Sequence, residues 1–178
     1  MADVLLMLGS PRAEGNTAAA AGRLQAELGL KPRQLIDLRA CDIGPFDYDP
    51  ELERDDFRAV ISRMINHRQI VFATPVYWYA MSGLMKTFFD RLTDLLLDPE
   101  ARPLGRALAG RRVWLLATGT DETLPDGFTV PFEKTASYFE MHWNSAFYVQ
   151  IDESVAPCAQ DLSPVSALAA AIARSEEE

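Results

Sequence analysis

The sequence predicts an α/β fold, a doubly wound five-stranded parallel sheet with helices on both faces. Short and almost wholly aliphatic runs recur along the chain, which is typical of strands buried on both faces of a parallel sheet. Segments with the 3.6-residue periodicity of helices separate these runs. This alternation implies right-handed crossovers, so the strands are expected to run parallel.

The first strand and the first helix are the clearest elements. The run Val4–Leu8 is apolar throughout, as a buried strand requires. Apolar residues over 18–28 follow a helical repeat, which stops at Gly29, a common C-terminal cap. A short apolar-rich segment at 34–38 then predicts the second strand.

The middle of the chain predicts a loop, two helices and a strand. Residues 39–50 contain Gly, Pro and Asp and are interpreted as a long surface loop. A helix with one apolar face is expected at 52–65, and the third strand at 69–74. The next helix, from residue 84 to about 97, has apolar residues on more than one stripe. This extra width fits either a partner subunit or cover by the following loop.

The last third of the chain completes the alternation. The fourth strand is expected at 112–118 and the fifth at 145–151. Between them, Pro131 suits the first position of a short helix that runs to residue 141. A final helix is expected to begin at Ser163.

Length and composition limit the classes of protein to consider. A chain of 178 residues suits one domain with one core, so residues 1–178 are expected to form a single domain. A formal net charge of -9 without any Lys/Arg run argues against nucleic acid or a membrane surface as partner. The 2 cysteines are far apart and form no disulfide framework or metal motif, so we expect no metal and a cytoplasmic protein.

The loop after the first strand has the composition of an anion-binding site. We call residues 9–17 the anion loop; it joins a strand to a helix N-terminus, whose unpaired N–H groups and dipole attract anions. Ser10 and Thr17 offer hydroxyl donors, Asn16 offers an amide or an N-cap, and Arg12 offers a guanidinium. Gly15 lets the backbone turn close to a ligand. The alternative is an ordinary strand-to-helix loop with an N-cap and a solvated arginine.

Two further loops are expected at the same edge of the sheet, because ligands of such folds lie beyond the carboxyl ends of the strands. The loop after the third strand carries three consecutive aromatic residues, and the loop after the fourth carries a glycine between two threonines. A phosphate at one end and a flat ring at the other would suit the three loops together. The residues singled out in the last two loops are Pro75, Val76, Tyr77, Trp78, Thr118 and Gly119.

Two segments resemble those of the flavodoxin-like NAD(P)H-dependent FMN reductases and quinone reductases. GSPRAEGNT is similar to the phosphate loop of that family, and TPVYWYAMSGLMKTFFDR is similar to its isoalloxazine loop and the following helix. The resemblance runs from Val4 to about Val149. It implies a flavodoxin-like fold and FMN as cofactor. It also implies that Ser10, Arg12, Asn16 and Thr17 hold the FMN phosphate, while Pro75 to Trp78 and Thr118-Gly119 contact the flavin ring.

The resemblance further implies an enzyme without a catalytic side chain, in which hydride passes from NADPH or NADH through FMN to a small acceptor such as a quinone or a flavin. The alternative is an FMN-binding electron-transfer protein without nicotinamide turnover. Many relatives carry a cysteine cluster after the second strand, where this chain has only Cys41, so FMN without a metal is expected. The family also implies a homodimer or homotetramer.

Overall fold

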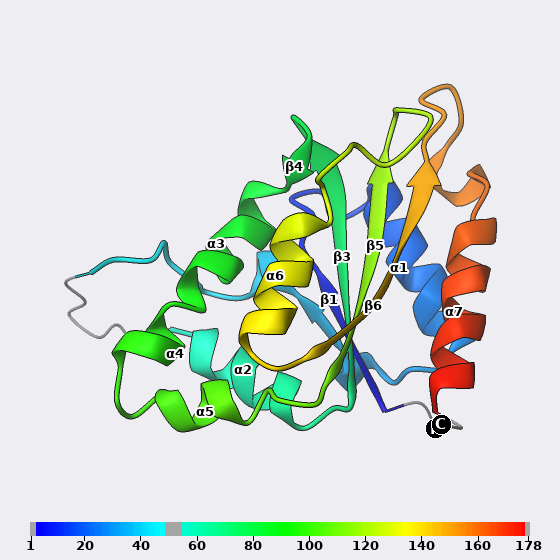
Figure 1. Cartoon of the computed structure of the whole chain (residues 1–178). Coiled ribbons are helices and arrows are strands. Elements are labelled where there is room, and N and C mark those ends of the chain that lie inside the picture. Colours follow the sequence, from blue (N-terminus) through cyan, green and yellow to red (C-terminus); the bar gives the residue numbers. More distant parts are fainter. Residues whose placement is uncertain (1–2, 49–54, 177–178) are drawn as a thin grey trace.

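The computed structural model describes residues 3–48 and 55–176, which form an α/β structure with a central sheet between two layers of helices (Figure 1). Five parallel strands lie in the order β2-β1-β3-β5-β6. A sixth strand, β4, pairs antiparallel with β3. The bounds are β1 Val4–Leu8, β2 Leu35–Asp37, β3 Gln69–Tyr77, β4 Ala80–Met81, β5 Arg112–Gly119 and β6 His142–Gln150. The predicted doubly wound five-stranded parallel sheet is confirmed, with β4 as an addition.

Helices cover both faces of the sheet, as predicted (Figure 1). Helices α1 and α7 lie on one face, and α2 to α6 lie on the other. Their bounds are α1 Asn16–Glu27, α2 Phe57–Ile65, α3 Gly83–Arg91, α4 Asp94–Leu97, α5 Arg102–Arg106, α6 Val130–Tyr138 and α7 Ser163–Ser175. Short 3-10 turns lie at Pro32–Gln34, Leu38–Ala40 and Pro157–Ala159. Within the described ranges, no helix is long and apolar enough to span a bilayer.

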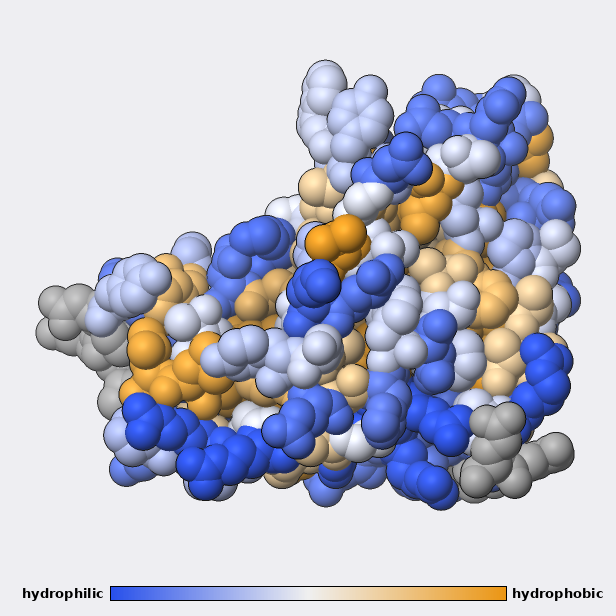
Figure 2. All heavy atoms as spheres, in the orientation of Figure 1, coloured by the Kyte–Doolittle hydropathy of each residue, from blue (hydrophilic) through white to orange (hydrophobic). Residues whose placement is uncertain are grey.

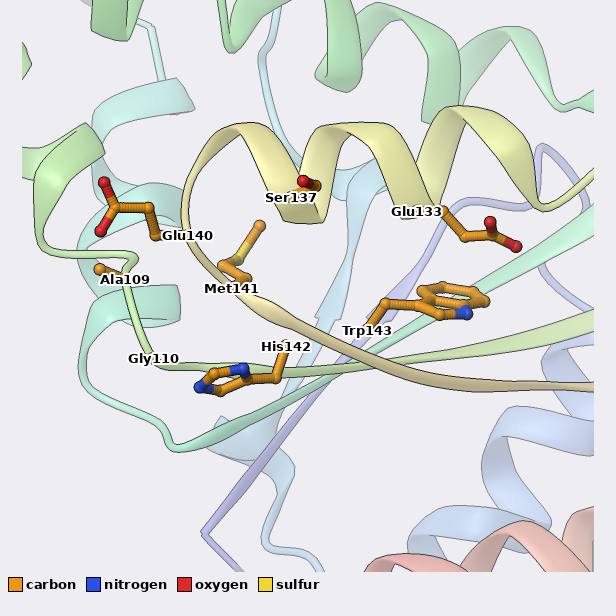
Figure 3. Close-up of a pocket in the computed structure, with 8 residues that line it drawn as sticks. All are labelled: Ala109, Gly110, Glu133, Ser137, Glu140, Met141, His142 and Trp143. Atoms are coloured by element: carbon orange, nitrogen blue, oxygen red, sulfur yellow. The ribbon is translucent and has the colours of Figure 1, made fainter.

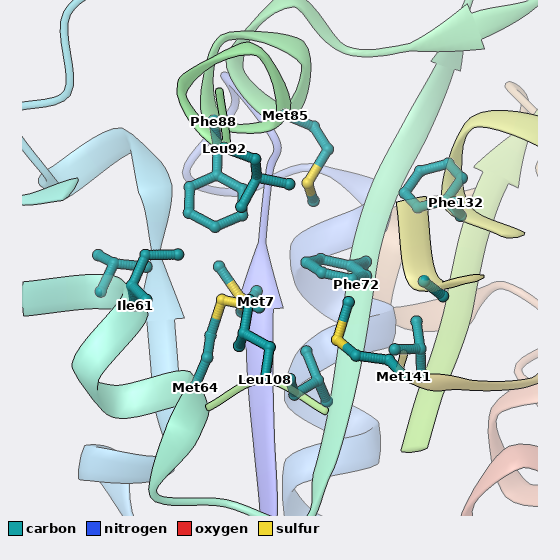
Figure 4. Packing of buried hydrophobic residues seen from close by; sticks show 14 of the residues in the cluster. Met7, Ile61, Met64, Phe72, Met85, Phe88, Leu92, Leu108, Phe132 and Met141 are labelled. Carbon is teal, nitrogen blue, oxygen red and sulfur yellow. The ribbon is translucent and has the colours of Figure 1, made fainter. Parts of the chain in front are cut away.

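The core is divided in two by the sheet, which explains why its central strands are apolar on both faces. In β1, Leu5 and Met7 belong to the cluster under α2, α3 and α6, whereas Val4, Leu6 and Leu8 belong to the cluster under α1 and α7. Figure 4 shows the first cluster, in which side chains from α2, α3 and α6 meet those of β1 and β3. Successive side chains of a strand point to opposite faces, so a strand whose two faces are both buried is apolar at every position.

Three segments differ from the prediction. Strand β3 continues to Tyr77 and turns back into β4, where the sequence had indicated a loop. Strand β6 begins at His142, three residues earlier than expected. Helix α6 begins at Val130, so Pro131 occupies its second position. The predicted start of the second helix at Leu52 lies outside the described residues; the described part is α2.

The predicted helix at 84–97 is two helices, α3 and α4, which meet at Leu92 and Thr93. At this junction the N–H groups of Leu92 and Thr93 bond to carbonyls three residues back, which tightens the turn and redirects the chain. Leu92 and Leu95 therefore both face the core. Much of the wide apolar surface is covered by the chain itself, while Leu97 remains 52% exposed.

Candidate functional site

The carboxyl ends of β1, β3 and β5 bring the three predicted loops to one edge of the sheet, and two buried hydroxyl contacts join them. Thr17, at the end of the anion loop, lies 2.6 Å from Thr118 between their Oγ1 atoms. At the start of the same loop, Ser82 Oγ donates to the Gly9 carbonyl over 2.5 Å. The anion loop is therefore held at both ends, each time by a residue from another loop.

Within the anion loop, the backbone is folded back on Ser10. The buried Ser10 Oγ accepts from the backbone N–H of Arg12 over 3.3 Å, so the loop turns tightly after β1. Gly15 is the N-cap of α1 and packs closely, since a Cβ there would lie 3.1 Å from the Arg12 Cβ. The Arg12 side chain is exposed and forms no hydrogen bond or ion pair with the described residues. It is therefore available to a ligand above the helix N-terminus.

Asn16 is the first residue of α1 rather than its N-cap, and its amide is the strongest sign of a ligand. The Oδ1 atom of Asn16 is buried and has no hydrogen-bond partner among the described residues. An unsatisfied buried amide is costly and calls for an explanation. Because the oxygen and nitrogen of an amide exchange places on rotation, Asn16 can donate to an anion or accept from a hydroxyl. A phosphorylated polyol would satisfy it.

The β3–β4 turn, with residues 76–81, forms what we call the aromatic hairpin. Its two-residue turn consists of Trp78 and Tyr79, with φ values of 49° and 63°. Asn and Gly are the usual residues in such turns, because bulky side chains are strained at positive φ. The two side chains are 93% and 70% exposed, and Figure 2 shows the tip projecting at the upper edge of the molecule. Backbone strain of this kind is typical of ligand sites.

At the end of β5, the backbone of Gly119 lies against neighbouring strands. A Cβ on Gly119 would lie 2.8 Å from Tyr148 Oη and 3.2 Å from the Val76 Cβ, so a larger residue would push these strands apart. Tyr148 Oη donates to the Asp121 carbonyl over 2.8 Å. Burial, together with the Asp121 charge, raises the pKa of Tyr148, so the phenol stays protonated.

Two buried hydroxyls of the site were missed by sequence reasoning. Ser82 is 1% exposed, and its Oγ accepts from the Met85 N–H as the N-cap of α3. Thr74 is fully buried, and its Oγ1 accepts from the Ser82 N–H over 3.1 Å. The signal for Ser82 was present, because a serine directly before a helical repeat predicts an N-cap. Thr74 gave no comparable signal.

Two cavities lie at the opposite, amino end of the sheet. The larger has a volume of about 620 Å³ and is formed by the start of β6 and by α6 (Figure 3). In this view Glu133 and Glu140 extend from either end of α6, with Trp143 below the helix. A second cavity of about 380 Å³ lies near Arg68 and Arg112. Neither includes a predicted site residue.

The chain is similar in sequence to known proteins. The sequence model of the NADPH-dependent FMN reductases matches residues 2–127. YwqN of Bacillus subtilis, named as an NAD(P)H-dependent FMN-containing oxidoreductase, is 34% identical over 68 residues, which are 38% of each chain. KefG of Cronobacter sakazakii, an ancillary protein of a potassium-efflux system, is 38% identical over 90 residues, 44% of this chain and 47% of KefG. The alignments thus span less than half of these relatives.

Solved structures show the same fold. The Trp repressor binding protein of Bacillus subtilis superposes with a TM-score of 0.71 at 22% identity, covering 93% of this chain and 96% of that one. At this identity the superposition supports the flavodoxin-like fold alone. Since the family model spans most of the chain, the resemblance noted from the two motifs is confirmed, and the protein belongs to the family of NADPH-dependent FMN reductases.

Proposed function

We propose that the protein is an FMN-dependent NAD(P)H oxidoreductase that passes a hydride from nicotinamide to a small electron acceptor, such as a quinone or a flavin. The observation that carries the proposal is the buried, unpartnered Oδ1 atom of the Asn16 amide at the first turn of α1, inside the anion loop. FMN offers both groups that this amide could use, a phosphate and a polyol chain. The family and the relative YwqN, named for FMN and NAD(P)H, support the same cofactor and electron donor.

In this proposal the anion loop holds the phosphate. Ser10, Arg12, Asn16 and Thr17 surround the first turn of α1, whose backbone N–H groups and dipole favour a dianion. Gly15 keeps the approach to these N–H groups clear of a side chain. The Thr17–Thr118 contact uses one hydroxyl hydrogen, so the pair retains a second one that could reach the ligand.

The aromatic hairpin and the end of β5 would hold the flavin ring. At the end of β3, Pro75 and Val76 lie beside Thr118 and Gly119 of β5. The positive φ at Trp78 reverses the chain so that β4 pairs with β3. When bound, FMN would supply the hydride chemistry, so no catalytic side chain is assigned. The chain would supply hydrogen-bond donors at the ring edge and, through Tyr77 and Trp78, an aromatic wall.

We further propose a cytoplasmic homodimer, or a tetramer built from such dimers, with small-molecule substrates as its partners. Leu97 at the end of α4 is 52% exposed, and hydrophobic side chains gather over α4 in Figure 2. An exposed apolar surface of this kind is typical of an interface. The net charge of -9 supports neither nucleic acid nor an anionic membrane as a partner.

The test is the visible absorption spectrum of the purified protein after addition of FMN and desalting. Retained flavin that is bleached anaerobically by NADPH or NADH supports the oxidoreductase, and the faster nucleotide is the preferred donor. Retained flavin that neither nucleotide bleaches would favour an FMN-binding electron carrier. A protein that retains no flavin and shows no flavin binding in titration would refute the proposal.

A further inference from the structure

Ser82, the residue after the aromatic hairpin, links the anion loop to α3 through its side chain and is bonded to β3 through its backbone N–H. Its Oγ donates its hydrogen to the Gly9 carbonyl over 2.5 Å and accepts from the Met85 N–H over 3.1 Å. Its backbone N–H bonds to Thr74 Oγ1, also over 3.1 Å. The residue thus contacts the start of the anion loop, the first turn of α3 and the end of β3.

The surroundings leave this contact little freedom. Ser82 is 1% exposed, so water cannot replace its hydroxyl without entering the core. Gly9 N–H is fixed to the Ala73 carbonyl over 2.8 Å, and a Cβ on Gly9 would lie 2.7 Å from Met85 Cε. The backbone of the anion loop at Gly9 therefore packs against the Met85 side chain of α3. The Ser82 hydroxyl is the polar link between the two segments.

We propose that Ser82 is a positioning residue that sets the distance between the phosphate site and the ring site. This inference rests on the proposed binding of FMN, whose phosphate and ring are joined by a flexible chain. A ligand that spans two sites gains affinity when both are held at a matching separation, because less conformational freedom of the protein is lost on binding. Ser82 itself contacts neither end of the ligand. Its loss should therefore weaken ligands that span both sites, and spare a ligand that uses one.

The experiment compares FMN with lumiflavin, which has the ring but neither the polyol chain nor the phosphate, by titration of flavin fluorescence. For Ser82→Ala we expect the FMN Kd to rise roughly tenfold, the effect of one well-formed hydrogen bond, and the lumiflavin Kd to change less than about twofold. Ser82→Gly removes the same hydroxyl but retains most of the helix cap, since glycine is a fair N-cap. It should show the same tenfold loss if the link to Gly9 is responsible.

Ser175→Ala is the matched control. Its hydroxyl also bonds to a backbone carbonyl, that of Ile172 over 2.7 Å, but at the opposite end of the sheet, so FMN affinity should not change. Equal weakening of FMN and lumiflavin in the Ser82 variants, or unchanged FMN affinity, would overturn the positioning role. A wild-type protein that binds lumiflavin no less tightly than FMN, or binds neither, would instead refute the proposed phosphate site and the inference with it.

Discussion

The charge of Arg12 gives the most direct test of whether the anion loop binds the FMN phosphate. Its side chain is exposed and has no hydrogen-bond or ion-pair partner among the described residues, so its replacement removes no polar contact within the chain. We expect Arg12→Ala to weaken FMN binding roughly 10- to 100-fold, the value of a hydrogen bond to a charged group, and to leave riboflavin binding unchanged. Fluorescence titration with both flavins measures this difference.

Arg23→Ala is the control for Arg12. Arg23 lies further along α1, where it pairs with Glu27 on an exposed face, so its loss should affect neither flavin. Parallel losses of FMN and riboflavin affinity in Arg12→Ala would show that Arg12 does not act through the phosphate.

Tyr79 is a residue at which the aromatic hairpin should lower the stability of the fold through backbone strain. Its φ of 63° is strained for a side chain with a Cβ, yet the side chain is 70% exposed and contributes little packing. We expect Tyr79→Gly to be more stable than Tyr79→Ala by about 1 kcal/mol, because only glycine relieves the strain. Urea unfolding of the two variants gives the difference. An alanine variant as stable as the glycine variant would show that the turn is not strained.

At the scale of elements, Arg91 fastens α3 to the segment that follows β2. Its guanidinium pairs with Asp55 and Asp94 and lies 5.0 Å from the centre of the Phe57 ring. Arg91 is therefore paired within the chain. On the same helix, Lys86 and Asp90 form an exposed ion pair at 2.6 Å.

The Arg91–Asp55 pair makes stability depend on acid pH. Burial alone would raise the pKa of Asp55, but hydrogen bonds from Arg91 and from the Phe57 N–H lower it overall. A carboxylate with a lowered pKa stabilises the fold fully above its unfolded pKa of about 4, and this stabilisation is lost as pH falls through the lower, folded pKa. The wild-type protein should therefore lose stability below about pH 4.

Asp55→Asn tests this dependence. We expect a loss of about 2 to 3 kcal/mol at pH 7, because Arg91 loses a largely buried partner, and a flatter stability curve below pH 4. Asp90→Asn, which removes an exposed pair from the same helix, should cost less than about 0.5 kcal/mol. Urea unfolding at a series of pH values measures both effects. If Asp55→Asn lost stability below pH 4 as steeply as the wild type, other carboxylates would cause the loss.

The sequence could predict those elements whose residue pattern fits only one type of secondary structure. Strands β1 and β5 were predicted because both faces are buried and no polar residue interrupts them. The aromatic hairpin was missed, because Trp78 and Tyr79 occupy a turn that local preference assigns to Asn and Gly. Such a turn is set by the pairing of β3 with β4, not by the propensities of its own residues.

The same limit applies to the site. The residues of the anion loop could be proposed from the sequence because they are consecutive and each donor type is visible there; their role in binding stays a prediction. The links Ser82–Gly9 and Thr17–Thr118 join residues 73 and 101 positions apart, and only the folded sheet brings them together. Sequence could place the loops at one edge but could not show which hydroxyls hold them there.

At the scale of the whole molecule, the proposed dimer must form against the electrostatic repulsion between two negatively charged copies. Each chain carries a net charge of -9, so two copies repel, and an interface must rest on apolar area such as that around Leu97. Screening shortens the range of this repulsion, and association should therefore strengthen as salt is raised.

Sedimentation velocity tests this arrangement through Leu97→Glu. We expect the wild-type protein to sediment as a dimer or a tetramer, and Leu97→Glu as smaller species, because the substitution buries a further negative charge at the interface. Val130→Glu is the matched control, since Val130 is also exposed, at 46%, but begins α6 at the end of that helix farther from α4 (Figure 1). A wild-type monomer at all concentrations, or a Leu97→Glu protein that associates like the wild type, would place no interface on α4.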